Sequence, residues 1–177
     1  MAKQPGFSNV ILTSFPRSGN TLIRSYIEKV SGIYTGSDCD VKRKLNRDLL
    51  DYGLLGEGCV DNRVFVIKTH YPERFGATKF LANKCIVIVR NPLDSITSLW
   101  NMVATGTHNC SIAYADYEKF QNEWDEYLRQ EASVWNDFHL FWMDHGSKQL
   151  PTYFIRFEDL MLKPRETLLD LFCFLLD

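Results

Sequence analysis

The chain has 177 residues, a length that suits one domain with a substantial core. Its formal net charge is −2, which excludes a globally basic protein of the kind that binds nucleic acid or an anionic membrane surface. Any anion site must therefore be formed locally. Before the first apolar run there is no room for a signal peptide, and no apolar run reaches spanning length, so we expect a cytoplasmic protein that does not enter the membrane.

The cysteines indicate neither a metal site nor a disulfide framework. They are widely spaced and form no CxxC pair, which fits no zinc template. An odd, scattered set is typical of reduced thiols, although one disulfide stays open. No carboxylate cluster offers a magnesium site either, so we expect no metal. The five cysteines are Cys39, Cys59, Cys85, Cys110 and Cys173.

Four apolar runs rich in β-branched residues alternate with helical patterns along the chain. The runs are continuous rather than alternating, as in strands that are buried on both faces of a parallel sheet. This order predicts a three-layer α/β sandwich with a central parallel sheet, formed by a single domain over residues 1–177. The predicted strands are 9–14, 64–68, 85–89 and 153–157.

The helical patterns follow in chain order. The first covers residues 20–31 and is closed by Gly32. Residues 34–62 are irregular and include a basic cluster at 42–47, which is either a solvated loop with a short helix, the interpretation we favour, or part of a substrate mouth. The helices expected further along are one after Pro92, two separate aromatic-rich helices at 117–128 and 131–144, and a last one from Pro164.

The loop after the first strand has the composition of an anion site. Residues 18–21 are Ser18, Gly19, Asn20 and Thr21, placed where a helix start offers unpaired N–H groups and a positive dipole end. Arg17 adds a positive charge and a rigid donor fork. Taken alone, the stretch is compatible with a phosphate-binding loop or with an ordinary capped helix.

The other strand ends favour the phosphate-binding interpretation. Lys68 and His70 are two residues apart, so in an extended segment they point the same way and could combine charge stabilisation with proton transfer. Arg90 ends a strand and Ser98 lies two turns into the next helix, where both could converge on a second anion. In a parallel α/β sheet such residues meet at the carboxyl edge, where ligands bind.

These segments resemble the sulfotransferase family. Residues 15–21 (FPRSGNT) resemble its 5′-phosphosulfate loop, and residues 90–98 (RNPLDSITS) its 3′-phosphate motif with the same spacing. Residues 68–72 (KTHYP) are similar to a segment of the cytosolic branch that carries the catalytic base. The pattern of Trp135, His139 and Trp142, and the segment 157–160 (FEDL), resemble two further motifs.

The resemblance implies a P-loop-like fold and transfer of a sulfuryl group from 3′-phosphoadenosine 5′-phosphosulfate to a hydroxyl or amine, leaving 3′-phosphoadenosine 5′-phosphate. His70 would be the general base, and Arg17 and Lys68 would stabilise charge. The donor would be held by Arg17, Ser18, Gly19, Asn20 and Thr21 at the 5′ end and by Arg90 and Ser98 at the 3′-phosphate. The acceptor is a small molecule, a glycan or a protein; the oligomeric state is open.

Three departures from the family accompany this resemblance. Leu22 stands where the cytosolic branch has an adenine-stacking Trp, and Phe157 stands where it has Tyr. The family's C-terminal donor-closing segment has no counterpart here, so we expect a C-terminally truncated form. One alternative is a catalytically weak or inactive nucleotide-binding relative. A second alternative is a P-loop kinase, which the lack of a Walker A motif disfavours.

We expect no catalytic role for two further histidines. His139 is interpreted as a hydrogen-bonded helix histidine and His108 as a surface residue. Residues 34–58 and 104–117 carry no motif, and we expect them to supply the walls of the acceptor pocket.

Overall fold

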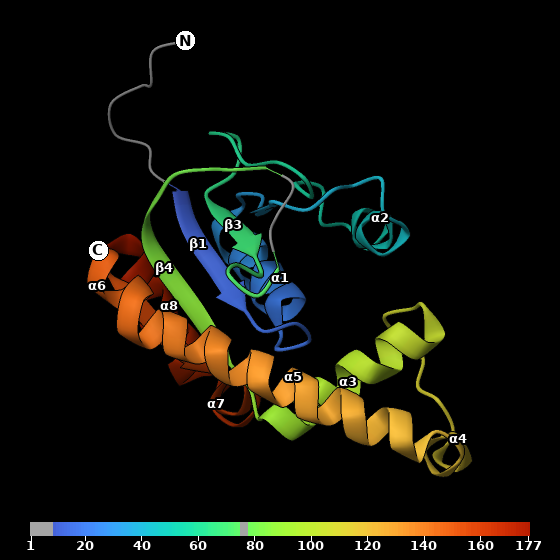
Figure 1. The fold of residues 1–177 in the computed structure, drawn as a ribbon. Coiled ribbons are helices and arrows are strands. Elements are labelled where there is room, and N and C mark those ends of the chain that lie inside the picture. The colour runs from blue at the N-terminus through green and yellow to red at the C-terminus, as the bar shows by residue number, and fades with distance from the viewer. Residues whose placement is uncertain (1–8, 75–77) are drawn as a thin grey trace.

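The computed structural model describes residues 9–74 and 78–177. In these residues an all-parallel five-stranded sheet has the order β2-β3-β1-β4-β5. Figure 1 shows its central strands β3, β1 and β4 side by side. The four predicted strands are therefore confirmed as members of one parallel sheet. The short edge strand β2 was not predicted, because a Gly-Ser pair has no apolar pattern. The strands are β1 (Asn9–Ser14), β2 (Gly36–Ser37), β3 (Val66–Thr69), β4 (Ala82–Val89) and β5 (Thr152–Arg156).

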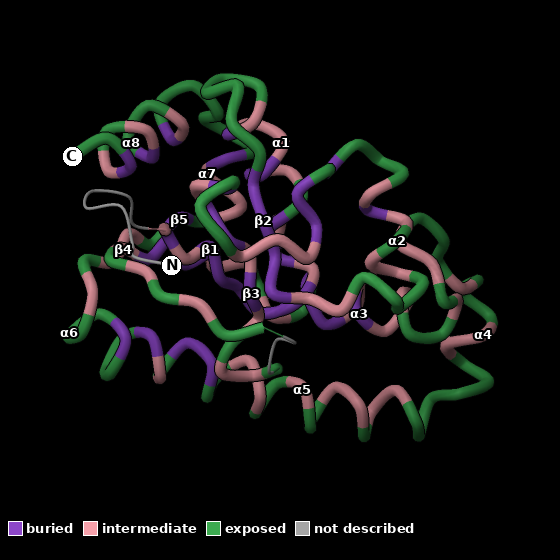
Figure 2. The backbone as a smooth tube through the Cα atoms, turned by 90° about the horizontal axis from the view of Figure 1, so that it is seen from above, coloured by how far each residue is buried: buried purple, intermediate pink, exposed green. Residues whose placement is uncertain are grey.

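Helices cover both faces of this sheet, which confirms the α/β sandwich. Helices α1, α7 and α8 pack on one face, and α3, α5 and the π-helical turn η1 pack on the other (Figure 2). The helical elements are α1 (Asn20–Ser31), α2 (Lys44–Asp51), α3 (Pro92–Thr105), α4 (Tyr114–Lys119), α5 (Gln121–Phe141), η1 (Trp142–Gly146), α6 (Ser147–Gln149), α7 (Phe157–Leu162) and α8 (Pro164–Leu176).

Alternation along the strands separates the two cores. Ile86 and Ile88 of β4 face the α1 side, and Cys85 and Val87 face the α3 side. Each strand side chain thus enters one of two packed layers, since successive Cβ atoms point to opposite faces. Burial on both faces explains why these strands are continuous apolar runs.

The two predicted aromatic helices are one helix, which corrects the sequence prediction. Helix α5 runs without a break from Gln121 to Phe141, and the residues between the two predicted helices, Arg129 and Gln130, are good helix formers. The start of the first predicted helix belongs instead to the short α4. Gly and Pro are the strongest helix breakers, and neither stands between residues 121 and 141.

The first predicted helix was placed correctly at both ends. Helix α1 covers Asn20–Ser31, and Gly32 ends it in the left-handed conformation with φ 70°. The N–H of Gly32 donates to the Glu28 carbonyl, which satisfies one of the last helix acceptors.

Parallel pairing brings the carboxyl ends of the strands to one edge. Thr13 of β1 is paired with Thr69 of β3 and with Val87 of β4. The segments that follow these strands therefore leave the sheet side by side, and they carry the polar residues singled out from the sequence. In the described part of the chain, no helix is long and apolar enough to cross a membrane.

Candidate active site

The loop between β1 and α1 turns sharply at two left-handed residues. Arg17 has φ 65° and Gly19 has φ 106°. A methyl group at Gly19 would lie 2.6 Å from the Phe157 ring, so both the backbone angle and the space require glycine here. The turn brings the α1 start against α7.

This turn leaves the helix start open to an anion. Within the described residues, none of the backbone N–H groups of residues 18–22 has an acceptor. The Ser18 hydroxyl is also buried without a hydrogen-bond partner in that part of the chain. Asn20 is held in place because its Nδ2 donates to Ser14 Oγ at 2.7 Å. Open donors at the positive end of α1 suit a phosphate or sulfate group.

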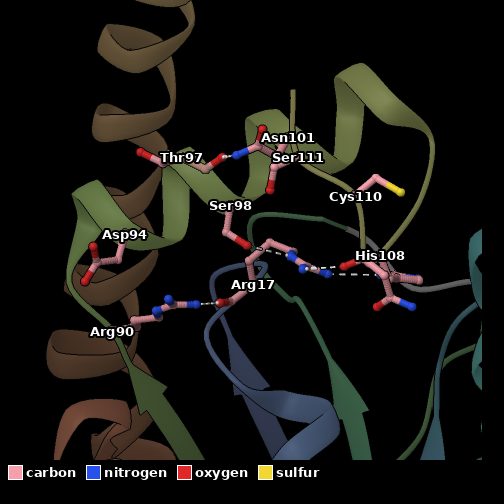
Figure 3. Close-up of a pocket in the computed structure, with 10 residues that line it drawn as sticks. Arg17, Arg90, Asp94, Thr97, Ser98, Asn101, His108, Cys110 and Ser111 are labelled. Carbon is pink, nitrogen blue, oxygen red and sulfur yellow. Dashed lines mark hydrogen bonds between the residues drawn. The ribbon is translucent and has the colours of Figure 1, made fainter. Parts of the chain in front are cut away.

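The Arg17 side chain extends away from this loop toward α3 and the loop after it (Figure 3). Its Nε donates to Ser98 Oγ at 3.0 Å, and one terminal nitrogen donates to the His108 carbonyl at 3.0 Å. The other terminal nitrogen lies 3.0 Å from His108 Nδ1. The guanidinium therefore joins the first loop to the segment that carries Ser98. Burial, and then the neighbouring Arg90 charge, lower the pKa of Arg17.

Arg90 supports the same loop from the end of β4. It donates to the Arg17 carbonyl at 2.7 Å, and its guanidinium lies 4.5 Å from the centre of the Phe157 ring. The Arg90 carbonyl accepts the Trp135 indole N–H at 3.2 Å. Its Nε is buried and has no hydrogen-bond partner among the described residues.

Two cavities meet at Arg17, Arg90 and His108. The smaller has a volume of about 310 Å³ and lies along α3 (Figure 3). Its lining residues are Arg17, Arg90, Asp94, Thr97, Ser98, Asn101, His108, Asn109, Cys110 and Ser111. The structure thus brings Arg90 and Ser98 to one cavity, and it adds Arg17 between them.

The larger cavity, of about 840 Å³, lies over the α1 start and the ends of β1 and β3. Gly19, Asn20 and Thr21 line it together with Lys68 and His70. Part of the basic cluster reaches it too, since Arg43 lines its wall, while Lys42, Lys44 and Arg47 are exposed. The unpatterned stretch supplies six further lining residues: Asp38, Cys39, Asp40, Leu45, Asn46 and Leu49.

His70 is oriented by a backbone hydrogen bond. Its Nδ1 lies 2.7 Å from the Ser14 carbonyl, which can only accept, so Nδ1 carries the proton. The lone pair of a neutral ring is then on Nε2. Burial, followed by the nearby Lys68 charge, holds the pKa of His70 well below its usual value. His70 is therefore neutral at pH 7 and able to accept a proton.

Lys68 lies beside His70 in the larger cavity. Burial lowers the pKa of its ammonium, and the Glu57 carboxylate opposes that effect. Within the described residues, no hydrogen-bond acceptor contacts the ammonium.

A buried ion pair supports the wall of the larger cavity. Arg24 is 1% exposed and contacts Glu57 at 2.5 Å, and its Nε donates to Thr35 Oγ1 at 2.8 Å. Cys39 donates to the same carboxylate at 2.9 Å. Although burial raises the pKa of Glu57, the Arg24 charge and the Cys39 contact are among the effects that bring it below its ordinary value. Sequence reasoning missed this network because its members share no motif or spacing.

His108 corrects a prediction. It was expected at the surface, but it is half-buried and touches Arg17 and the Leu45 carbonyl. A lone histidine in a loop gives no pattern from which these contacts could be found. His139 is the hydrogen-bonded helix histidine that was predicted, with Nδ1 2.6 Å from the Trp135 carbonyl.

Glu158 accepts the Asn91 N–H at 2.8 Å. It therefore links the start of α7 to the loop before α3. Across residues 9–74 and 78–177, no group of three or more His, Cys, Asp or Glu side chains is placed to hold a metal ion.

The fold and these strand-end residues define a sulfotransferase-type α/β domain. The family model described as "Sulfotransferase domain" matches residues 60–175, and the chain belongs to this family. The match includes the segments of Lys68, His70, Arg90 and Ser98, and it begins after the Arg17 loop.

The curated relatives that the chain resembles include three WSCD family members of insects. One from Aedes aegypti is 26% identical over 175 residues, which cover 93% of this chain and 49% of the relative. One from Drosophila pseudoobscura pseudoobscura is 27% identical, covering 85% of this chain and 45% of the relative, and one from Drosophila melanogaster is 26% identical, covering 85% and 44%. The chain spans about half the length of the curated relatives it matches.

Proposed function

We propose that this chain transfers a sulfuryl group from 3′-phosphoadenosine 5′-phosphosulfate to an acceptor hydroxyl or amine, with His70 as general base. The observation that carries the proposal is the neutral His70 ring, fixed with its Nε2 lone pair free in the same cavity as the open helix start of α1. Family membership supports the reaction class.

The residues present fit such a donor at both ends. The N–H groups of residues 18–21 and the orphaned Ser18 hydroxyl would hold the 5′-phosphosulfate. Arg90, with its unpartnered Nε, and Ser98 would hold the 3′-phosphate, and Arg17 would lie between the two groups. Two anion sites on one rim suit a bisphosphorylated nucleotide better than a triphosphate.

The proposed sulfuryl transfer can be written with the donor, the acceptor and this chain's own side chains. The bound donor supplies an electrophilic sulfur with a phosphate leaving group. His70 Nε2 takes the acceptor proton as the acceptor-to-sulfur bond forms and the sulfur-to-phosphate-oxygen bond breaks. Lys68 and Arg17 stabilise the negative charge that gathers on the leaving oxygen. Positioning and charge stabilisation supply most of the barrier reduction, as in phosphoryl transfer.

The acceptor would approach through the larger cavity. Its wall from residues 38–49 mixes acidic, basic and apolar side chains, which is compatible with a small molecule, a glycan or a protein side chain. Cytoplasmic location and a one-domain organisation of residues 1–177 remain part of this proposal.

A calorimetric titration tests the donor assignment. The chain is titrated with 3′,5′-adenosine bisphosphate without metal and, separately, with ATP and Mg²⁺. We expect binding of the bisphosphate and at least tenfold weaker binding of ATP. Preference for ATP would support a kinase instead and overturn the proposal.

A turnover assay separates the enzyme from a nucleotide-binding relative. The chain is incubated with labelled donor and a panel of phenols, amines, sugars and peptides. Transfer above that of a His70→Asn variant supports the enzyme. Bisphosphate binding with no transfer to any acceptor would favour the inactive relative.

A further inference from the structure

His108 connects three parts of the structure at the junction of the two cavities. It lies in the loop between α3 and α4, with Nδ1 3.0 Å from a terminal nitrogen of Arg17. Its Nε2 lies 3.0 Å from the Leu45 carbonyl of α2, and its own carbonyl accepts a second Arg17 N–H at 3.0 Å. Figure 3 shows the Arg17 guanidinium between Ser98 and His108.

These partners fix the protonation of the His108 ring. A guanidinium only donates hydrogen bonds, so Nδ1 must offer a lone pair to Arg17. The Leu45 carbonyl only accepts, so Nε2 must carry the proton. One neutral tautomer satisfies both contacts, and it is the opposite of the tautomer that Ser14 imposes on His70.

A second contact ties the same loop to the end of α2. The Asn109 side-chain amide donates to the Tyr52 hydroxyl. The His108 loop is thus attached to the α2 region at two points, and α2 supplies Leu45, Asn46 and Leu49 to the larger cavity. The location of the Arg17 guanidinium is therefore linked to the wall of that cavity.

We infer that His108 is a positioning residue that holds Arg17 between the two anion sites before the donor nucleotide binds. The inference rests on the proposed function. Arginine has several rotatable bonds, and a free side chain loses that freedom when a ligand orders it. Because His108 and Ser98 already order the guanidinium, the donor does not bear this cost. Removal of the His108 ring should weaken donor binding about threefold to tenfold.

Two conservative variants separate the two ring contacts. In His108→Asn the amide oxygen can occupy the Nδ1 position and accept from Arg17, without reaching Leu45. In His108→Gln the amide nitrogen can occupy the Nε2 position and donate to the Leu45 carbonyl. We expect His108→Asn to bind 3′,5′-adenosine bisphosphate within about twofold of wild type, and His108→Gln and His108→Ala to bind it about threefold to tenfold more weakly. The reverse ranking, or equal affinities for all variants, overturns the inference.

A double-mutant cycle tests whether His108 acts through Arg17. Lysine at position 17 keeps the charge but lacks the planar fork that reaches His108 and Ser98 together. In an Arg17→Lys background, His108→Ala should cause less than a twofold further loss of bisphosphate affinity. A full additive loss would mean that His108 acts independently of Arg17, which contradicts the inference.

Two controls keep this result separate from the proposed function and from folding. His145 is exposed, stacks on Phe141 and lines neither cavity, so His145→Ala should bind the bisphosphate like wild type. Failure of the wild-type chain to bind the bisphosphate overturns the proposed function itself, whereas wild-type binding with no effect of His108 variants overturns only this inference.

Nitrogen NMR of the His108 ring then reports the tautomer directly: a protonated Nδ1 contradicts the Arg17 contact. Thermal unfolding of each variant identifies any that fail to fold.

Discussion

The two cavities that meet at Arg17 differ in the origin of their walls. The smaller is formed by α3, the loop after it and two arginines at strand ends, and its polar residues Arg90 and Ser98 come from one short motif. The larger combines the α1 start, the ends of β1 and β3 and the irregular stretch 38–49. The proposed 3′-phosphate site is thus encoded by local spacing, whereas the wall of the proposed acceptor site depends on a segment with no local pattern.

The largest effect is expected at the base in the larger cavity. His70→Asn keeps a donor for the Ser14 carbonyl but removes the basic nitrogen, so transfer should fall about 10²- to 10⁴-fold. Affinity for 3′,5′-adenosine bisphosphate should stay within about twofold, since His70 would face the acceptor. The measurements are turnover of labelled donor and calorimetry. Unchanged turnover would show that His70 is not the base, and the proposed proton transfer in the larger cavity would be wrong.

The buried Arg24–Glu57 ion pair behind the larger cavity should contribute strongly to the stability of the folded chain. Glu57→Ala leaves the Arg24 charge buried and unpaired, so the free energy of unfolding should fall by about 3–5 kcal/mol. Urea unfolding measures the change. Asp61→Ala, which removes an exposed pair with Arg63, is the matched control, and its loss should be much smaller because solvent screens the two charges. Equal losses of unfolding free energy for the two variants would mean that the wall of the larger cavity does not depend on the Arg24–Glu57 pair.

The smaller cavity should control nucleotide affinity without a comparable effect on turnover at saturation. Arg90→Ala removes a charged donor beside the proposed 3′-phosphate, so bisphosphate affinity should fall about 10- to 100-fold. Arg90→Lys keeps the charge and tests the fork geometry. Arg63→Ala, a change at an exposed arginine, serves as control. Wild-type affinity of Arg90→Ala would remove the 3′-phosphate site from this cavity.

The smallest expected effect is the pH dependence of stability from His70. Its pKa is well below the ordinary value in the folded chain, so below about pH 6.5 the unfolded chain binds a proton that the folded chain does not. The free energy of unfolding therefore falls as pH decreases, by about 1 kcal/mol per such histidine between pH 7.5 and pH 5.5. His139, whose pKa is also lowered, adds to the loss.

The variant His70→Asn isolates this contribution. Its loss of stability between the two pH values should be smaller than that of wild type by about 1 kcal/mol. Urea unfolding at both pH values gives the comparison. Equal losses would indicate that His70 is not kept neutral by burial in the larger cavity.

Much of the fold follows from local sequence pattern. The runs 9–14 and 85–89 are apolar because both faces of these strands are buried, and that requirement is visible in a single sequence. The α1 boundaries are also local, since Gly32 ends the helix and the polar loop precedes it. The two-residue β2 and the continuity of α5 were missed, because pairing to β3 and the absence of a breaker gave no positive signal.

The class of this protein can be inferred from local sequence features: parallel strands, a polar loop before α1, and basic and hydroxyl residues at the strand ends in the order of a sulfotransferase. Those features depend on spacing within short segments, so they can be recognised without a structure. Only the tertiary structure decided that Arg17 bonds Ser98 and His108, that Arg24 and Glu57 form a buried pair, and that residues 38–49 line the larger cavity. These contacts join residues far apart in the chain, and their partners are fixed by how the sheet and helices pack, which no local pattern records.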